Sequence, residues 1–118
     1  MSSPDSESII LVLCNVPDAT CADLIAHQLV EQQLAACVNV LPPVRSIYRW
    51  QGKVEAATEL PLLIKTTGRA YPALQSLILQ QHPYEVPELI VLPLVDGLPA
   101  YFDWVRAETF SLVTPTSI

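Results

Sequence analysis

The sequence predicts an α+β domain of the ferredoxin-like type, β-α-β-β-α-β, with one extra C-terminal helix. Apolar runs rich in β-branched residues alternate with segments whose apolar residues recur at helical spacing. In this arrangement helices pack on one face of a four-stranded antiparallel sheet. The 118 residues suit one domain. We expect a flexible N-terminus at residues 1–8, a single domain at 9–108 and a C-terminal tail at 109–118.

The chain is predicted to begin with a central strand and a helix. Ile9 to Cys14 is a continuous apolar run, which is typical of a strand buried on both faces. A turn follows, in which Asp18 or Thr20 can cap a helix over residues 21–34. The apolar face of this helix is predicted to contain Cys21, Leu24, Ile25, Leu29 and Leu34.

The middle of the chain is predicted to form a long hairpin. Its first arm, Cys37 to Trp50, is interrupted at Pro42-Pro43, because proline cannot donate to a strand ladder. Gln51 to Lys53 forms the turn, and Val54 to Thr67 returns. The first arm would span about 45 Å at ~3.3 Å per residue, whereas a small domain is only about 30 Å across. The hairpin tip should therefore overhang its own core.

Two features predict that copies of this chain associate. The overhanging tip carries Ile47, Tyr48 and Trp50, which favour burial against another subunit. Charged residues make up only 15% of the chain, against roughly 25% in typical soluble domains. We therefore expect a closed homo-oligomer.

The second half is predicted to add a helix, a strand and a short helix. Residues 70–81 have apolar positions at helical spacing, and Leu89 to Val95 is an apolar run typical of a buried strand. Asp96-Gly97 marks a turn. Pro99 suits the first turn of a last helix that reaches Glu108.

The most distinctive segment is His82-Pro83-Tyr84-Glu85-Val86-Pro87-Glu88, which lies between a helix and a strand. Proline restricts both itself and the residue before it, so the helix should end at His82 and a stiff, extended segment should follow. Polar side chains held rigidly beside a core favour a binding site. A histidine at a helix C-terminus is also typical of a purely structural role.

Composition excludes several classes of protein. A net charge of −6 makes nucleic acid an unsuitable partner, because phosphate binding needs clustered lysine and arginine. Three cysteines without a C-x-x-C pair form neither a disulfide framework nor a zinc site, and reduced thiols indicate a cytosolic protein. No apolar stretch reaches the ~20 residues of a membrane span. No nucleophile and base form a recognisable catalytic motif, so we do not expect an enzyme.

The motifs of the chain resemble those of the CutA divalent-cation tolerance family, in order and over nearly all of Ile9 to Val105. The matching segments are Leu11-Val12-Leu13-Cys14, Pro17-Asp18, Leu34 to Asn39, Ser46 to Lys53 with Glu55, Ile64-Lys65-Thr66, His82 to Glu88 and Leu92-Pro93. The resemblance implies a ferredoxin-like fold close to that of the PII signalling proteins. It also implies a homotrimer in bacterial cytoplasm that binds divalent metals, copper above all.

The resemblance implies metal ligands at Cys14 and His82. Family members that carry a second histidine have it at the position of Gln81, whose amide oxygen is a poorer copper ligand than imidazole. Cys14 also closes an apolar strand, where a cysteine can serve as a small core residue. Both roles stay open for Cys14.

A cleft between subunits is a second candidate site. Trp50, Glu59, Lys65, Tyr84 and Glu88 could line it and accept a small anionic or metal ligand. The alternative is an ordinary set of surface ion pairs with an aromatic interface anchor. The function classes that remain are a trimeric copper-binding protein, a PII-like trimer that binds a small ligand or signals, and an assembly scaffold without a ligand.

Overall fold

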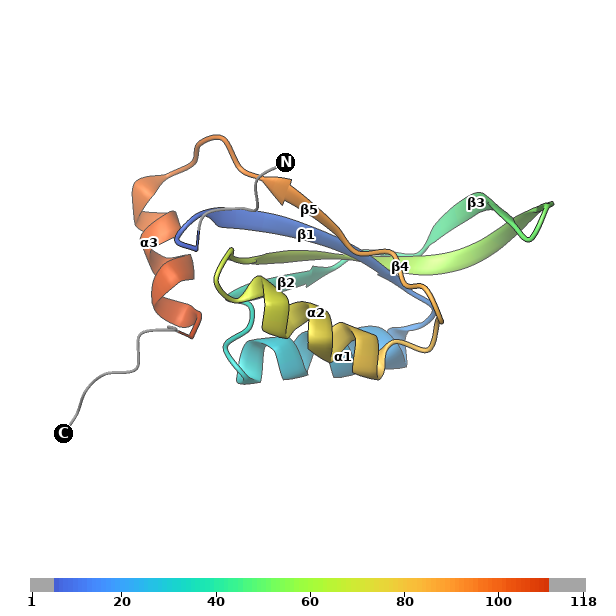
Figure 1. Cartoon of the computed structure of the whole chain (residues 1–118), viewed down its shortest axis with the longest axis horizontal. Helices are drawn as coiled ribbons and strands as arrows, with labels where there is room; N and C mark the ends of the chain where they lie inside the picture. Colours follow the sequence, from blue (N-terminus) through green and yellow to red (C-terminus); the bar gives the residue numbers. More distant parts are fainter. Residues whose placement is uncertain (1–5, 111–118) are drawn as a thin grey trace.

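The structure is a computed structural model that describes residues 6–110, over which the chain forms five strands and three helices (Figure 1). Their bounds are β1 Ile9–Val16, α1 Ala19–Glu31, β2 Cys37–Val40, β3 Val44–Trp50, β4 Lys53–Thr67, α2 Tyr71–Gln81, β5 Ile90–Pro93 and α3 Pro99–Glu108. The predicted ferredoxin-like order is confirmed. The long first hairpin arm is divided into β2 and β3, with Pro42-Pro43 between them.

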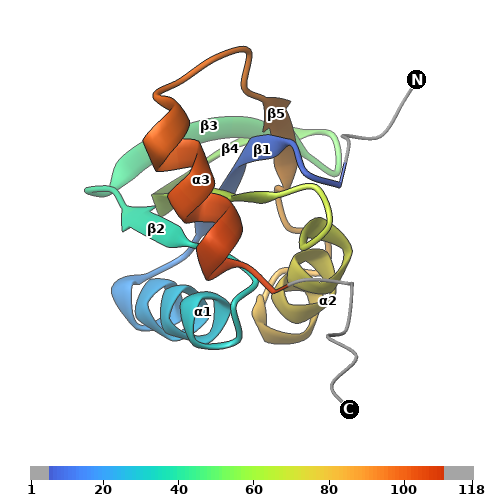
Figure 2. The same ribbon diagram turned by 90° about the vertical axis from the view of Figure 1, so that its left-hand side faces the viewer.

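The sheet has the order β2-β4-β1-β5, and all its pairs are antiparallel. β1 is a central strand, as predicted, because it pairs with β4 on one side and β5 on the other. Its alternate residues Ile10, Val12, Cys14 and Val16 are fully buried in the core. Helices α1 and α2 cover this face of the sheet (Figure 2). We call the opposite side the open face.

Strand β4 is long enough to serve two ladders. Its second half pairs with β1 and β2, and its first half pairs only with β3, from Val44 opposite Glu59 to Trp50 opposite Lys53. Gln51 and Gly52 close the hairpin with φ angles of 50° and 80°. The hairpin projects beyond the rest of the molecule (Figure 1). With the hairpin included, the molecule measures 55 × 29 × 27 Å. The predicted overhang is confirmed.

Helix α1 buries a narrower face than its apolar spacing predicted. Asp18 caps α1 by accepting a hydrogen bond from the Cys21 amide at 2.8 Å. Ala22, Ile25 and Leu29 are the buried residues of this helix. Leu24 is exposed, so its predicted place on the core face is wrong: a residue one position before Ile25 is rotated by about 100° from it.

The last strand and the last helix differ from the predictions. The run at Leu89 to Val95 does not form a buried strand, because β5 is an edge strand whose open-face residues Ile90 and Leu92 are exposed. The segment before it bends at Pro83 to Val86 instead of running extended. Helix α3 leaves the layer of α1 and α2 and lies across the far end of the sheet (Figure 2), where Val105 packs on Ile9.

Arg69 holds both flanks of the domain together. Its guanidinium pairs with Glu7 at 2.8 Å and donates to the carbonyls of Phe110 at 2.6 Å and Arg106 at 2.9 Å. Its backbone amide donates to the carbonyl of Ser6 at 2.9 Å. Residues close to the predicted boundaries of the domain, at 8/9 and 108/109, are thus held in place by contacts with Arg69. The remainder of the predicted N-terminus and tail, residues 1–5 and 111–118, lies outside the described residues. No helix within residues 6–110 is long and apolar enough to cross a membrane.

Candidate functional site

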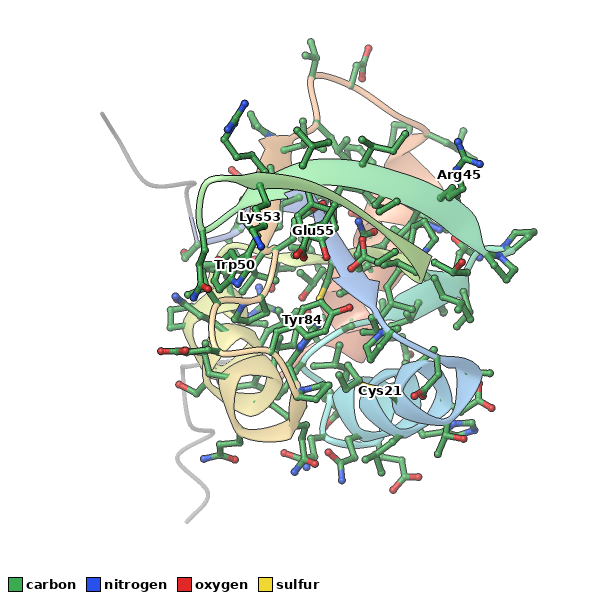
Figure 3. All side chains as sticks on the ribbon, turned by 90° about the vertical axis from the view of Figure 1, so that its right-hand side faces the viewer. Cys21, Arg45, Trp50, Lys53, Glu55 and Tyr84 are labelled. Carbon is green, nitrogen blue, oxygen red and sulfur yellow. The ribbon has the colours of Figure 1, made fainter. Side chains whose placement is uncertain are left out.

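A hollow of about 670 Å³ lies between the overhanging hairpin and the segment that follows α2. Figure 3 looks along the molecule from the hairpin end, with Trp50 and Glu55 on the hairpin and Tyr84 on the segment below it. Tyr48 is the third aromatic residue of the lining. The site therefore depends on the hairpin overhang.

Strand alternation explains which hairpin residues reach the hollow. Residues two apart on a strand share a face, so Tyr48 and Trp50 on β3 point the same way. The ladder places Glu55 opposite Tyr48 and Glu59 opposite Val44, four residues apart on β4. Glu55 and Glu59 both line the hollow.

Glu59 and Tyr84 connect the two walls of the hollow. The Tyr84 hydroxyl donates to Oε2 of Glu59 at 3.2 Å, and Glu59 is only 8% exposed. Burial raises the pKa of Tyr84, and the hydrogen bond to the Glu59 carboxylate raises it further. The phenol therefore remains a neutral donor at physiological pH.

His82 is held on both sides of its ring. It is 6% exposed and caps the end of α2. Its Nδ1 accepts from the Tyr84 amide at 3.1 Å, which leaves the proton on Nε2 to donate to the Asn15 carbonyl at 2.7 Å. The ring also packs on Tyr84 with a centroid distance of 4.7 Å. Both nitrogens are thus engaged, and the histidine fixes the Tyr84 segment to the end of β1.

The fold brings the two predicted metal ligands into the same part of the molecule. His82 bonds to Asn15, 67 positions away in the sequence, and Cys14 directly precedes Asn15. The Cys14 thiol is fully buried. The pKa of this thiol is raised to about 12, first by burial and then by the negative charges of Glu88, Cys21 and Glu59. The thiol is therefore protonated at neutral pH.

These residues do not form a preorganised metal site in the single chain. Copper binds an imidazole nitrogen with a free lone pair, or a thiolate. Here the lone pair of His82 Nδ1 accepts from the Tyr84 amide, Nε2 carries the proton, and the Cys14 thiol is protonated. Among residues 6–110 no three histidine, cysteine or acidic side chains are grouped to hold a metal ion.

The other predicted site residues separate into two sets. Trp50, Glu59, Tyr84 and Glu88 share the hollow, and the Glu88 carboxylate accepts from the Asn15 amide at 3.3 Å. Lys65 lies elsewhere, since its ammonium bonds to Asn39 and lies 3.9 Å from the Cys37 sulfur.

Gln81 lines a different hollow of about 370 Å³, between α1 and α2. Sequence reasoning missed Tyr48, Glu55 and Glu85 in the first hollow. The alternation of residues along the hairpin strands could have identified the first two.

The topology, the overhanging hairpin and the helix across the far end of the sheet define a class: ferredoxin-like α+β proteins with an extended β3-β4 hairpin. The family described as CutA1 divalent ion tolerance protein matches residues 10–108 of the chain. The chain belongs to this family, as its motifs indicated.

Known relatives match over most of their length. The divalent-cation tolerance protein CutA of Thermus thermophilus is 50% identical over 99 residues, which cover 84% of this chain and 96% of that protein. The solved CutA1 of Shewanella sp. SIB1 has a TM-score of 0.87 and 38% identity, and covers 93% of this chain and 100% of that one. The solved CutA of Archaeoglobus fulgidus, described as periplasmic, has a TM-score of 0.82 and 32% identity, with 85% and 97% covered.

Proposed function

We propose that this chain acts in divalent-cation tolerance as a homotrimer that binds copper or another divalent cation. The observation that carries the proposal is the match to CutA1 over residues 10–108, together with relatives named for divalent-cation tolerance. Binding without catalysis, and a place in the cytoplasm, are parts of the same proposal. Cell fractionation tests the location, because the relative from Archaeoglobus fulgidus is described as periplasmic.

The surface of the single chain supports assembly. On the open face, Ile90 and Leu92 of β5 are exposed beside the half-buried Leu11 and Leu13 of β1. At the hairpin tip, Ile47 is also exposed. A contiguous apolar face of this kind is typical of an interface, since its burial gains about 25 cal/mol per Å².

Light scattering after gel filtration tests the trimer. The unaltered protein should have the mass of three chains at micromolar concentration, and Leu92→Glu should shift it towards one chain. The matched control is Leu79→Glu, since Leu79 is an exposed leucine on α2, away from the open face. A monomeric mass for the unaltered protein would overturn the assembly, and a trimeric Leu92→Glu variant would exclude this face.

The chemistry of the two side chains, and their position near the same end of β1, support a copper site at His82 and Cys14. Imidazole and thiolate suit copper, and the hydrogen bond to Asn15 places His82 at the end of the strand that carries Cys14. Binding there requires the imidazole to release one of its two hydrogen bonds. Gln81 is not expected to contribute, because it lines the hollow between α1 and α2.

Titration of the metal-free protein with Cu(II), followed by calorimetry, tests this site. His82→Ala should remove the binding. His27→Ala is the matched control, because His27 is the only other histidine of the chain and lies exposed on α1. Unchanged stoichiometry and affinity in the His82→Ala variant would exclude the named site.

The hollow under the hairpin favours a second candidate function, a PII-like trimer that binds a small ligand. Its volume of about 670 Å³ falls in the range of roughly 300–1,000 Å³ that is usual for such sites. A thermal-shift screen of metabolites tests this function, because a ligand that binds only the folded state raises the melting temperature. A screen without any stabilising compound would count against it.

A further inference from the structure

We propose that the hollow under the hairpin binds a linear organic polycation, a diamine or polyamine with an apolar carbon chain. The proposal rests on the second candidate function and names its ligand class. It concerns the hollow lined by Trp50, Glu59 and Tyr84, which the copper hypothesis at His82 does not use.

The charge of the lining favours a cation. Four glutamates, Glu55, Glu59, Glu85 and Glu88, line the hollow, and no lysine, arginine or histidine among residues 6–110 joins them there. Lys65, which could have served an anionic ligand, is bonded to Asn39 instead. An anion would therefore meet carboxylates on both walls with no positive partner.

Glu59 points independently to a cationic ligand. Although it is 8% exposed, its one hydrogen bond within residues 6–110 comes from the neutral Tyr84 hydroxyl, to Oε2. The ion pairs of that part of the chain are Arg69 with Glu7 and Arg106 with Asp103, and neither involves Glu59. A carboxylate with so little exposure and no basic partner in that part of the chain is suited to a cationic ligand, which would supply the missing counter-charge.

The remaining lining residues suit an amine with a carbon chain. The faces of Trp50, Tyr48 and Tyr84 attract ammonium groups through the negative potential of their rings. Val86 adds apolar surface for methylene groups. A single compact ion is less suitable, because no three acidic or other ligating side chains of residues 6–110 converge on one point.

The spacing of the carboxylates favours more than one positive charge. Glu55 and Glu59 lie four residues apart on β4, which separates them by about 13 Å along the strand. Glu85 and Glu88 lie on the opposite wall. An extended molecule with ammonium groups several carbon atoms apart can reach carboxylates along the whole hollow.

Calorimetric titration of the full-length assembled protein with spermidine tests the proposal. We expect saturable binding with one site per chain, and none for 1,8-octanediol, a neutral chain of similar length. Glu59→Gln should weaken spermidine binding roughly ten- to a hundredfold, as expected for the loss of one charged contact. Glu88→Gln, at an exposed position, should also weaken it and serves if Glu59→Gln fails to fold.

The matched control is Glu31→Gln, which removes the same charge from the exposed end of α1 and should leave binding unchanged. Absence of spermidine binding, or equal binding in Glu59→Gln and the unaltered protein, would overturn the proposal. It is also overturned if spermidine does not bind and Glu59→Gln dissociates the oligomer, since a basic side chain of a second copy would then fill the hollow. If only an anionic metabolite stabilises the protein in the thermal-shift screen, the small-ligand function is retained and the polycation proposal is rejected. If no compound stabilises it and spermidine does not bind, both are rejected.

Discussion

Replacement of Arg69 by methionine tests whether one side chain holds the two flanks of the domain. The guanidinium is 7% exposed and donates charged hydrogen bonds to the carbonyls of Phe110 and Arg106. Its partner Glu7 is 61% exposed, so that ion pair contributes little to stability. Two charged hydrogen bonds at about 1.5–3 kcal/mol each predict a loss of about 3–6 kcal/mol in the free energy of unfolding.

Urea unfolding followed by tryptophan fluorescence measures this loss. All variants are compared at one protein concentration, because assembly makes the midpoint depend on concentration. The control Glu7→Gln should cost less than about 1 kcal/mol, since it alters only the exposed partner. A loss below about 1 kcal/mol for Arg69→Met, or an equal loss in both variants, would refute the assignment of this stability to the carbonyl contacts.

Two further predictions concern buried polar groups of the core. Thr66→Val should lower the free energy of unfolding by about 1–3 kcal/mol, because its buried hydroxyl donates to the Leu34 carbonyl at 2.7 Å, whereas exposed Thr58→Val should be nearly neutral in the same urea assay. Cys14 should resist iodoacetamide at pH 8 in the native protein and react once urea unfolds it, because burial raises the pKa of its thiol to about 12. Since this pKa exceeds the ordinary value of 9.0, stability should fall as pH rises above 9, and Cys14→Ala should reduce that fall. Labelling of native Cys14 at the unfolded rate, as read by mass spectrometry, would contradict its burial.

Local patterns were sufficient for most of the fold. The apolar run at Ile9 to Cys14, the Asp18 cap and the glycine of the hairpin turn each determine structure within a few residues. The exposure of Ile90 and Leu92 could not be predicted in the same way, because an apolar run indicates burial without indicating by which molecule. The sequence pattern for β5 fits burial by another copy of the chain.

The candidate site was less predictable, because it depends on register and side-chain direction across the chain. Lys65 and Glu59 are six residues apart on one strand, a separation of about 20 Å, so within one chain they line different places. A cleft between subunits that contains both stays a prediction. The engagement of both His82 nitrogens also escaped prediction, because Asn15 lies 67 residues away in the sequence. The pairing of β3 with β4 placed Tyr48 and Glu55 in the hollow.

The role of β4 as the common partner of three strands has a consequence for how the chain folds during synthesis. Among the strands that the structure describes, β1, β2 and β3 pair with β4, and the remaining pair joins β1 to β5. No ladder can therefore form until residues 53–67 have left the ribosome, and the apolar β1 must wait unpaired for most of that time. Long-range pairs such as Ile9 with Thr67 also slow folding. A nascent chain stalled before β4 would expose three strands with no partner of their own.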